Sequence, residues 1–180
     1  QAGENQTEWQ PSIAVAIVKS EGPVRDALQL LIDRAKGIRC TAFFADAESA
    51  LKGIPRHRPE VLLMDMNLPN GSAIECVRSL RRQLIEMKVL MLTDGEDVDH
   101  IFDALRAGAN GFIFKRTLAA DAIPAIVEVA EGGAPMSSAV IAQVVAFFQK
   151  QGETSSMFNQ LSPRETQILD CLAEGFLYKE

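Results

Sequence analysis

The stretch VLLMDMNLPNG, residues 61–71, runs four apolar residues directly into an aspartate and then into a Pro-Asn-Gly turn. A short apolar run bounded by turn residues predicts a buried β-strand. Asp65 then stands at the carboxyl end of that strand. In open α/β sheets this end faces the crevice where ligands bind. Asp65 is therefore either a functional carboxylate or a residue that only caps the turn through backbone amides.

Strand-like and helix-like segments alternate on both sides of this stretch. Strand-like runs occupy residues 12–18, 38–44, 61–64, 88–92 and 111–114, and helical patterns occupy residues 24–36, 47–54, 72–84, 98–108 and 118–133. Apolar strands that alternate with amphipathic helices predict a parallel sheet covered on both faces. We therefore expect an α/β domain with a flavodoxin-like, doubly wound, five-stranded parallel sheet.

The predicted sheet domain spans residues 12–131, after a polar and disordered tail of residues 1–11. Residues 132–160 are expected to form a linker helix and a polar linker. Ser137 or Ser138 would cap this helix, whose apolar stripe is Val140, Val144, Phe147 and Phe148. Residues 161–180 contain a capping box followed by one helix, too little to bury a core. We expect them to begin a second, all-α domain.

Composition excludes several classes of function. The net charge is −6, so the bulk of the chain should not attract nucleic acid. Apolar runs are too short to cross a bilayer, and the polar start is unlike a secretory segment. Three cysteines and two histidines lack metal-ligand spacing. Isolated cysteines of this kind fit a reducing, cytoplasmic setting. Because a glycine-rich phosphate loop and a Ser/His/Asp set are also missing, we expect the protein not to be an enzyme.

Three polar residues lie at or just after the ends of predicted strands. Asp65 ends the third strand, Thr93 follows the fourth and Lys115 follows the fifth. Because these ends converge in a doubly wound sheet, a carboxylate, a hydroxyl and an ammonium should meet in one crevice. Such a set predicts a phosphoryl-accepting site, with the aspartate as nucleophile and the other two groups binding phosphoryl oxygens.

From about residue 13 to residue 131 the chain resembles the receiver domain of bacterial two-component response regulators, which has the CheY-like form of this fold. The segments AGANGFIFK (107–115) and GGAPMSSAV (132–140) resemble the NarL/FixJ type. Residues 161–180, LSPRETQILDCLAEGFLYKE, are similar to the opening of a LuxR-type helix-turn-helix. The resemblance implies a signal-controlled transcription regulator that binds DNA through a C-terminal domain and forms a homodimer. It leaves a sensor histidine kinase as a partner open.

The resemblance also assigns roles by position. It makes Asp65 the phosphoacceptor, Thr93 the switch hydroxyl and Lys115 the lysine that binds the phosphoryl group. Phe112 takes the place of the switch aromatic, or is a plain core residue of its strand. Asn67 takes the place where a backbone carbonyl would bind Mg²⁺.

The chain departs from the family at the end of the first strand, where Lys19 and Ser20 replace a pair of acids. With two acids, the acceptor aspartate and one lysine, a family pocket has charge −2 and needs a divalent cation. Here Asp65, Lys115 and Lys19 sum to +1, so we expect weak or absent Mg²⁺ binding. Lys19 could instead extend into solvent, and Glu21 could turn inward and restore a metal site.

These features predict an atypical receiver in a DNA-binding regulator, controlled by dimerisation, a ligand or a protein partner. Two alternatives stay open. One is a NarL-type regulator phosphorylated in the ordinary way, and the other is a phosphate-blind, receiver-like adaptor that binds a partner protein. The sequence leaves the activating signal, the target promoter and the face of the dimer undetermined.

Overall fold

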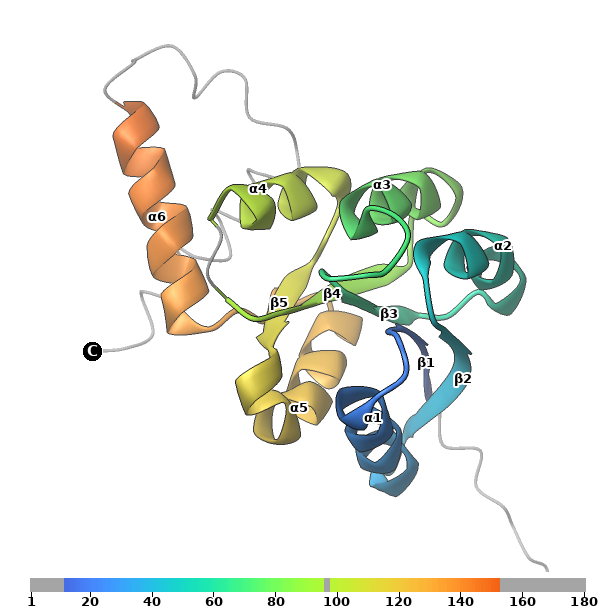
Figure 1. The fold of residues 1–180 in the computed structure, drawn as a ribbon. Coiled ribbons are helices and arrows are strands. Elements are labelled where there is room, and N and C mark those ends of the chain that lie inside the picture. Colours follow the sequence, from blue (N-terminus) through green and yellow to red (C-terminus); the bar gives the residue numbers. More distant parts are fainter. Residues whose placement is uncertain (1–11, 96–97, 153–180) are drawn as a thin grey trace, which may run out of the picture.

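The five apolar runs form strands, and amphipathic segments between them form helices (Figure 1). The computed structural model describes residues 12–95 and 98–152. The strands are β1 (Ile13–Val18), β2 (Ile38–Phe44), β3 (Val61–Asp65), β4 (Lys88–Thr93) and β5 (Gly111–Phe114). The helices are α1 (Pro23–Arg34), α2 (Ala47–His57), α3 (Ala73–Gln83), α4 (Val98–Ala107), the 3₁₀ turn η1 (Lys115–Thr117), α5 (Leu118–Ala130) and α6 (Ser138–Gly152).

All neighbouring strands pair in parallel, in the order β2-β1-β3-β4-β5. This order confirms the predicted flavodoxin-like, CheY-like sheet. The direction in which the chain crosses the sheet reverses between β1 and β3, which are hydrogen-bonded neighbours. At such a switch point the loops after the two strands turn to opposite faces and leave a crevice. Asp65, at the end of β3, therefore lies beside the residues that follow β1.

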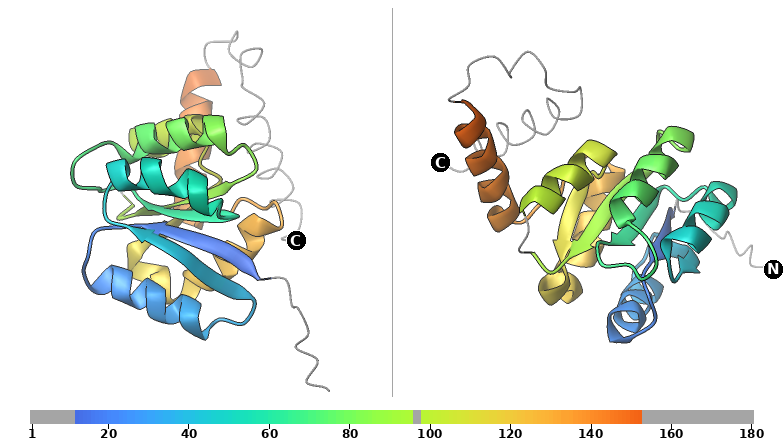
Figure 2. Two further views of the ribbon diagram at one scale, coloured as in Figure 1. Left: turned by 90° about the vertical axis from the view of Figure 1, so that its right-hand side faces the viewer. Right: turned by 45° about the horizontal axis from the view of Figure 1, so that its top comes forward.

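Helices cover both faces of the sheet (Figure 2). Each face has its own hydrophobic core. One face carries α2, α3 and α4, and the other carries α1 and α5. Every residue of β3 is buried, with Leu62 and Met64 in one core and Val61 and Leu63 in the other. A strand covered on both faces is apolar throughout. The carboxylate of Asp65 thus stands at the end of a strand in which every residue is buried.

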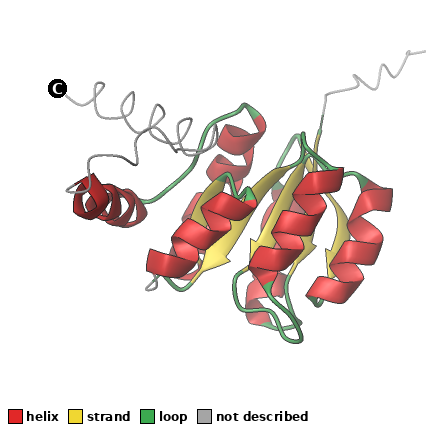
Figure 3. Cartoon of the chain, turned by 90° about the horizontal axis from the view of Figure 1, so that it is seen from above, coloured by secondary structure: helices red, strands yellow, loops and turns green. Residues whose placement is uncertain are grey.

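The last described helix, α6, lies beside α4 at one end of the row of helices (Figure 3). Val140 and Val144 are completely buried there. The ring of Phe147 stacks on that of Phe102 in α4, with 3.7 Å between the ring centroids. Ser137 caps the helix, because its hydroxyl accepts a hydrogen bond from the backbone N–H of Val140 at 3.2 Å. The apolar stripe expected on this helix therefore packs against the sheet domain.

The segment before α6 runs along the outer edge of β5. The backbone N–H of Phe112 donates to the carbonyl of Pro135 at 2.9 Å. Gly111 allows this approach, because a Cβ atom there would lie 2.5 Å from the same carbonyl oxygen. The two contacts join the start of the linker to the last strand of the sheet.

Three of the sequence predictions concern regions outside the described residues: the N-terminal tail, the polar linker after residue 152 and the helix-turn-helix fragment at 161–180. Across the described ranges, 12–95 and 98–152, every helix is too short or too polar to cross a membrane.

Candidate functional site

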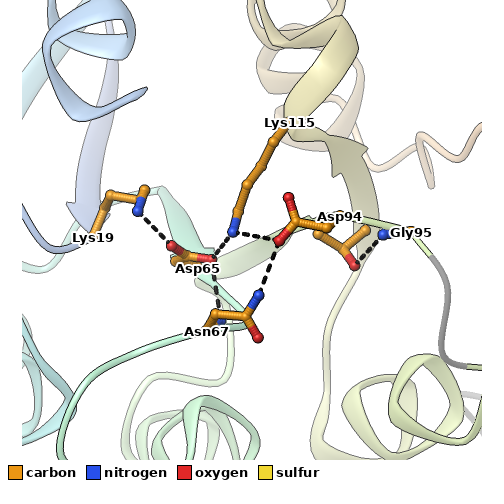
Figure 4. A network of polar contacts seen from close by, with 7 residues as sticks. Lys19, Asp65, Asn67, Asp94, Gly95 and Lys115 are labelled. Carbon is orange, nitrogen blue, oxygen red and sulfur yellow. Dashed lines mark hydrogen bonds and ion pairs between the residues drawn. The ribbon is translucent and has the colours of Figure 1, made fainter. Parts of the chain in front are cut away.

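The carboxyl ends of four strands bring together the charged residues of one pocket (Figure 4). Lys19 follows β1, Asp65 ends β3 and Lys115 begins the turn after β5. Asp94 follows the last residue of β4. The convergence of Asp65 and Lys115 follows the spacing in the sequence, because the ends of parallel strands lie on one edge.

Asp65 is completely buried, and each of its carboxylate oxygens faces an ammonium group. Oδ1 lies 2.9 Å from Nζ of Lys115 and accepts a hydrogen bond from the backbone N–H of Asn67 at 3.1 Å. Oδ2 lies 2.8 Å from Nζ of Lys19. That contact has the length of an ion pair without the angles of a hydrogen bond, so Oδ2 accepts none from the described residues. Two nearby cations offset the desolvation of this buried charge.

Lys19 points into the pocket. Its side chain is only 13% exposed, which argues against an extension into solvent. Glu21 lies the other way: its side chain is 89% exposed and sits 3.6 Å from Arg25, one turn along the chain. Glu21 is thus not placed to supply a metal-binding carboxylate. Ser20 is half-buried in the turn between β1 and α1.

Asp94 completes the pocket and was not predicted from the sequence. Its Oδ2 accepts hydrogen bonds from Nζ of Lys115 and from the side-chain amide of Asn67, both at 2.9 Å. With Asp94 counted, the pocket holds two lysines and two aspartates and has a net charge of zero, rather than +1. Its place directly after Thr93, at the same sheet edge, was the signal that could have identified it.

Lys115 is the group that both carboxylates share. Burial lowers its pKa, but the hydrogen bonds and charges of Asp65 and Asp94 raise the pKa by more, so it lies above the ordinary 10.5. Lys115 is therefore a fixed cation at neutral pH, with two of its three protons directed at carboxylate oxygens.

Thr93 and Phe112 lie outside this network of charges. Thr93 is 8% exposed, and its hydroxyl accepts a hydrogen bond from the backbone N–H of Gly95 at 3.1 Å. Phe112 is buried in the core beneath α4. In this conformation, Phe112 therefore has the surroundings of an ordinary core residue.

Cations surround Asp65, whereas a magnesium ion would need oxygen ligands there. Mg²⁺ needs near-octahedral oxygen ligands and is usually held by one or two carboxylates. Here an ammonium group occupies the approach to Oδ2 of Asp65, and another joins Asp65 to Asp94. Within residues 12–95 and 98–152, His, Cys, Asp and Glu form no group of three that could hold a metal.

Known proteins resemble this chain in both sequence and fold. The profile of the response regulator receiver domain matches residues 15–128. The oxygen regulatory protein NreC of Staphylococcus epidermidis is 28% identical over 173 residues, which cover 92% of this chain and 79% of NreC. NreC of Staphylococcus aureus is 29% identical over 172 residues, with the same coverage of 92% and 79%.

Solved structures of response regulators also superpose on this chain. A two-component response regulator of the LuxR family from Aurantimonas sp. SI85-9A1 superposes with a TM-score of 0.70 at 26% identity, covering 75% of this chain and 96% of that one. RcsB from Salmonella typhimurium superposes with a TM-score of 0.68 at 18% identity, covering 92% and 78% of the two chains, and supports the fold alone.

Proposed function

Because the chain belongs to the response regulator receiver family, we propose that it is a DNA-binding transcription regulator whose receiver pocket works without Mg²⁺. One observation carries the second half of this proposal. The ammonium of Lys19, which stands at one of the two positions where the family has its acidic pair, lies 2.8 Å from the completely buried Oδ2 of Asp65. In this proposal Lys19 supplies the positive charge that a bound metal would otherwise provide.

The charge balance supports this proposal. Lys19 and Lys115 already neutralise Asp65 and Asp94, so a divalent cation would raise the pocket to +2 and would have to displace an ammonium. The same pairing stabilises the charged carboxylate of Asp65 and makes it a poorer nucleophile. We infer that a dimerisation step, a ligand or a protein partner sets the activity, in place of ordinary phosphoryl transfer from a sensor histidine kinase.

DNA binding is proposed for the domain that begins near residue 161, which resembles a LuxR-type helix-turn-helix. The LuxR-family regulator from Aurantimonas and the NreC relatives support this assignment. Such a regulator would work in the cytoplasm and needs no catalytic activity of its own. A receiver-like adaptor that recruits a partner protein is the alternative if the C-terminal segment does not bind DNA.

A homodimer is proposed through α1 and α5. Packing of α6 on α4 buries apolar surface on the other face of the sheet. On the exposed side of α1 and α5, Leu30 and Val127 are 49% and 37% accessible to solvent. Exposed apolar residues on adjacent helices are typical of an interface between copies.

The test places an acid at position 19, as in the family, and measures whether this creates a metal site. Mg²⁺ titrations of the wild type, Lys19→Asp and the control Lys36→Asp are followed by NMR, together with acetyl-phosphate labelling of Asp65. We expect saturable, millimolar Mg²⁺ binding and Mg²⁺-dependent labelling only in Lys19→Asp. Lys36 is exposed after α1, so its variant matches the change in charge without entering the pocket. Equal Mg²⁺-dependent labelling of the wild type would instead establish an ordinary phosphorylated regulator.

A further inference from the structure

Asp94 makes polar contacts with two of the pocket groups best suited to bind an oxyanion. Its Oδ2 lies 2.9 Å from Nζ of Lys115 and 2.9 Å from the side-chain nitrogen of Asn67 (Figure 4). Neither the family resemblance nor the acceptor role of Asp65 assigns any part to this residue. A carboxylate is thus already bound where two donors from different loops converge.

The donors themselves define what the position would recognise. Lys115 offers an ammonium whose protons are partly used by Asp65, and Asn67 offers an amide proton pair. Lys19 adds a second ammonium on the other side of Asp65. Two ammonium groups and a neutral amide, spread around the carboxylates of Asp65 and Asp94, favour an anion with several oxygens, such as phosphate or sulfate. In this structure the Oδ2 atom of Asp94 accepts the hydrogen bonds of Lys115 and Asn67 that such an anion would accept.

Asp94 differs from Asp65 in how firmly it is held. Asp65 is completely buried, whereas the side chain of Asp94 is 64% exposed. Moving Asp94 into water costs little, because ion pairs of exposed side chains contribute little to stability. Moving Asp65 out would leave the ammonium groups of Lys19 and Lys115 without this buried carboxylate as a partner, which costs more. Asp94 is therefore the carboxylate that an incoming anion would displace.

We propose that Asp94 is an intramolecular competitor for oxyanions: its carboxylate occupies Lys115 and Asn67, and a tetrahedral oxyanion binds the pocket only when Asp94 withdraws. Asp94 thus acts on specificity, by excluding anions that bind weakly, and not as a catalytic residue. This inference rests on the proposed function only in taking Asp65 and Lys115 as the receiver pocket. It holds whether or not that pocket also accepts Mg²⁺.

The experiment compares sulfate binding by the full chain in four forms: the wild type, Asp94→Ala, Asp94→Asn and Asp103→Ala. Amide shifts of Asn67 and Gly95 follow sulfate at constant ionic strength. We expect Asp94→Ala to bind sulfate about threefold to fivefold more tightly than the wild type, and Asp94→Asn also to bind more tightly because the competing charge is gone. Asp103, exposed on α4, controls for net charge, and its variant should bind within about twofold of the wild type.

Loss of a merely structural contact would weaken binding, so the direction of the change is decisive. Equal or weaker sulfate binding by Asp94→Ala would overturn the proposal, as would an equal gain in Asp103→Ala. Adding Lys115→Met to Asp94→Ala should abolish the gain, and a retained gain would also contradict the proposal. Mg²⁺ titrations of the same samples test the metal-independent function separately, since Mg²⁺ binding by the wild type would reject that function whatever sulfate does.

Discussion

Lys115 is the residue on which both acidic side chains of the pocket depend, with its Nζ 2.9 Å from an oxygen of Asp65 and 2.9 Å from an oxygen of Asp94. Lys19 approaches Asp65 from the other side. Alternating charges of this kind offset the desolvation of a buried carboxylate without a metal. The pocket is thus held by the same lysine that would bind a phosphoryl group.

The raised pKa of Lys115 makes stability depend on alkaline pH. A lysine with a higher pKa in the folded state contributes stability that is complete below the ordinary value of 10.5 and is lost as pH rises through the folded value. We expect the free energy of unfolding to fall more steeply above about pH 10.5 in the wild type than in Lys115→Met. Urea titrations over that range measure this slope. The control Lys36→Met should keep the wild-type slope, and an identical slope in Lys115→Met would contradict the prediction.

Some residues of the pocket could be predicted from the sequence and others could not. Asp65 and Lys115 were predicted to meet because strand ends converge, and the unusual lysine at position 19 was evident from the sequence alone. Asp94 was missed, since the direction of a side chain one residue beyond a strand depends on the loop and not on the pleat of the strand. The roles assigned to Asp65, Thr93, Phe112 and Lys115 stay predictions.

At the scale of elements, Gly95, just after β4, lies close against the ring of Phe114 at the end of β5. Gly95 has a φ of +103°, and a Cβ atom there would lie 2.1 Å from the ring of Phe114. The ring of Phe114 in turn lies 4.4 Å from the guanidinium carbon of Arg116. A side chain at position 95 would therefore push apart the two strand ends that present Asp94 and Lys115.

Gly132 provides a matched control for this packing. It has a similar φ of +98°, but open space surrounds its missing Cβ. We expect Gly132→Ala to lower the free energy of unfolding by about 1 kcal/mol through backbone strain alone. Gly95→Ala should lower it by about 2 kcal/mol more because of the clash. Denaturant unfolding of both variants checks this difference, and equal losses would show that the ring moves aside at no cost.

The strands and helices were predicted better than the residues of the pocket. All five strands were predicted at their observed places, because each is a short apolar run between helices of a different period. The prediction was least complete for α2, which contains Pro55. This helix was predicted for residues 47–54 but continues through Pro55 to His57. Proline usually marks a helix end, but here the packing of Ile54 in the core keeps the last turn helical.

At the scale of the whole molecule, α6 decides which surfaces remain open. The sequence predicted its apolar stripe but not where the stripe would dock, because the choice among helices depends on which face the sheet leaves uncovered. Docking against α4 leaves Leu30 on α1 and Val127 on α5 among the few large apolar side chains exposed on the described residues. Ile85, in the loop before β4, is more exposed still, at 70%.

This contrast allows the proposed dimer to be tested. We expect the double substitution Leu30→Asp with Val127→Asp to raise the dimer dissociation constant at least about tenfold, because two charges would have to be buried between copies. Ile85→Asp changes an even more exposed residue away from α1 and α5, and should leave the constant unchanged. Sedimentation equilibrium of the full chain measures both. If Ile85→Asp alone disrupts the dimer, the interface lies elsewhere.

The hydrogen bond from Phe112 to Pro135 has a consequence for the outer margin of the sheet. A last strand normally presents free amides and carbonyls that invite another chain to extend the sheet. The linker occupies part of this margin before α6 begins, so β5 is less able to recruit a foreign strand. A fragment that ended before Pro135 would lose this protection, and would bring a new tendency to self-associate that the longer chain does not have.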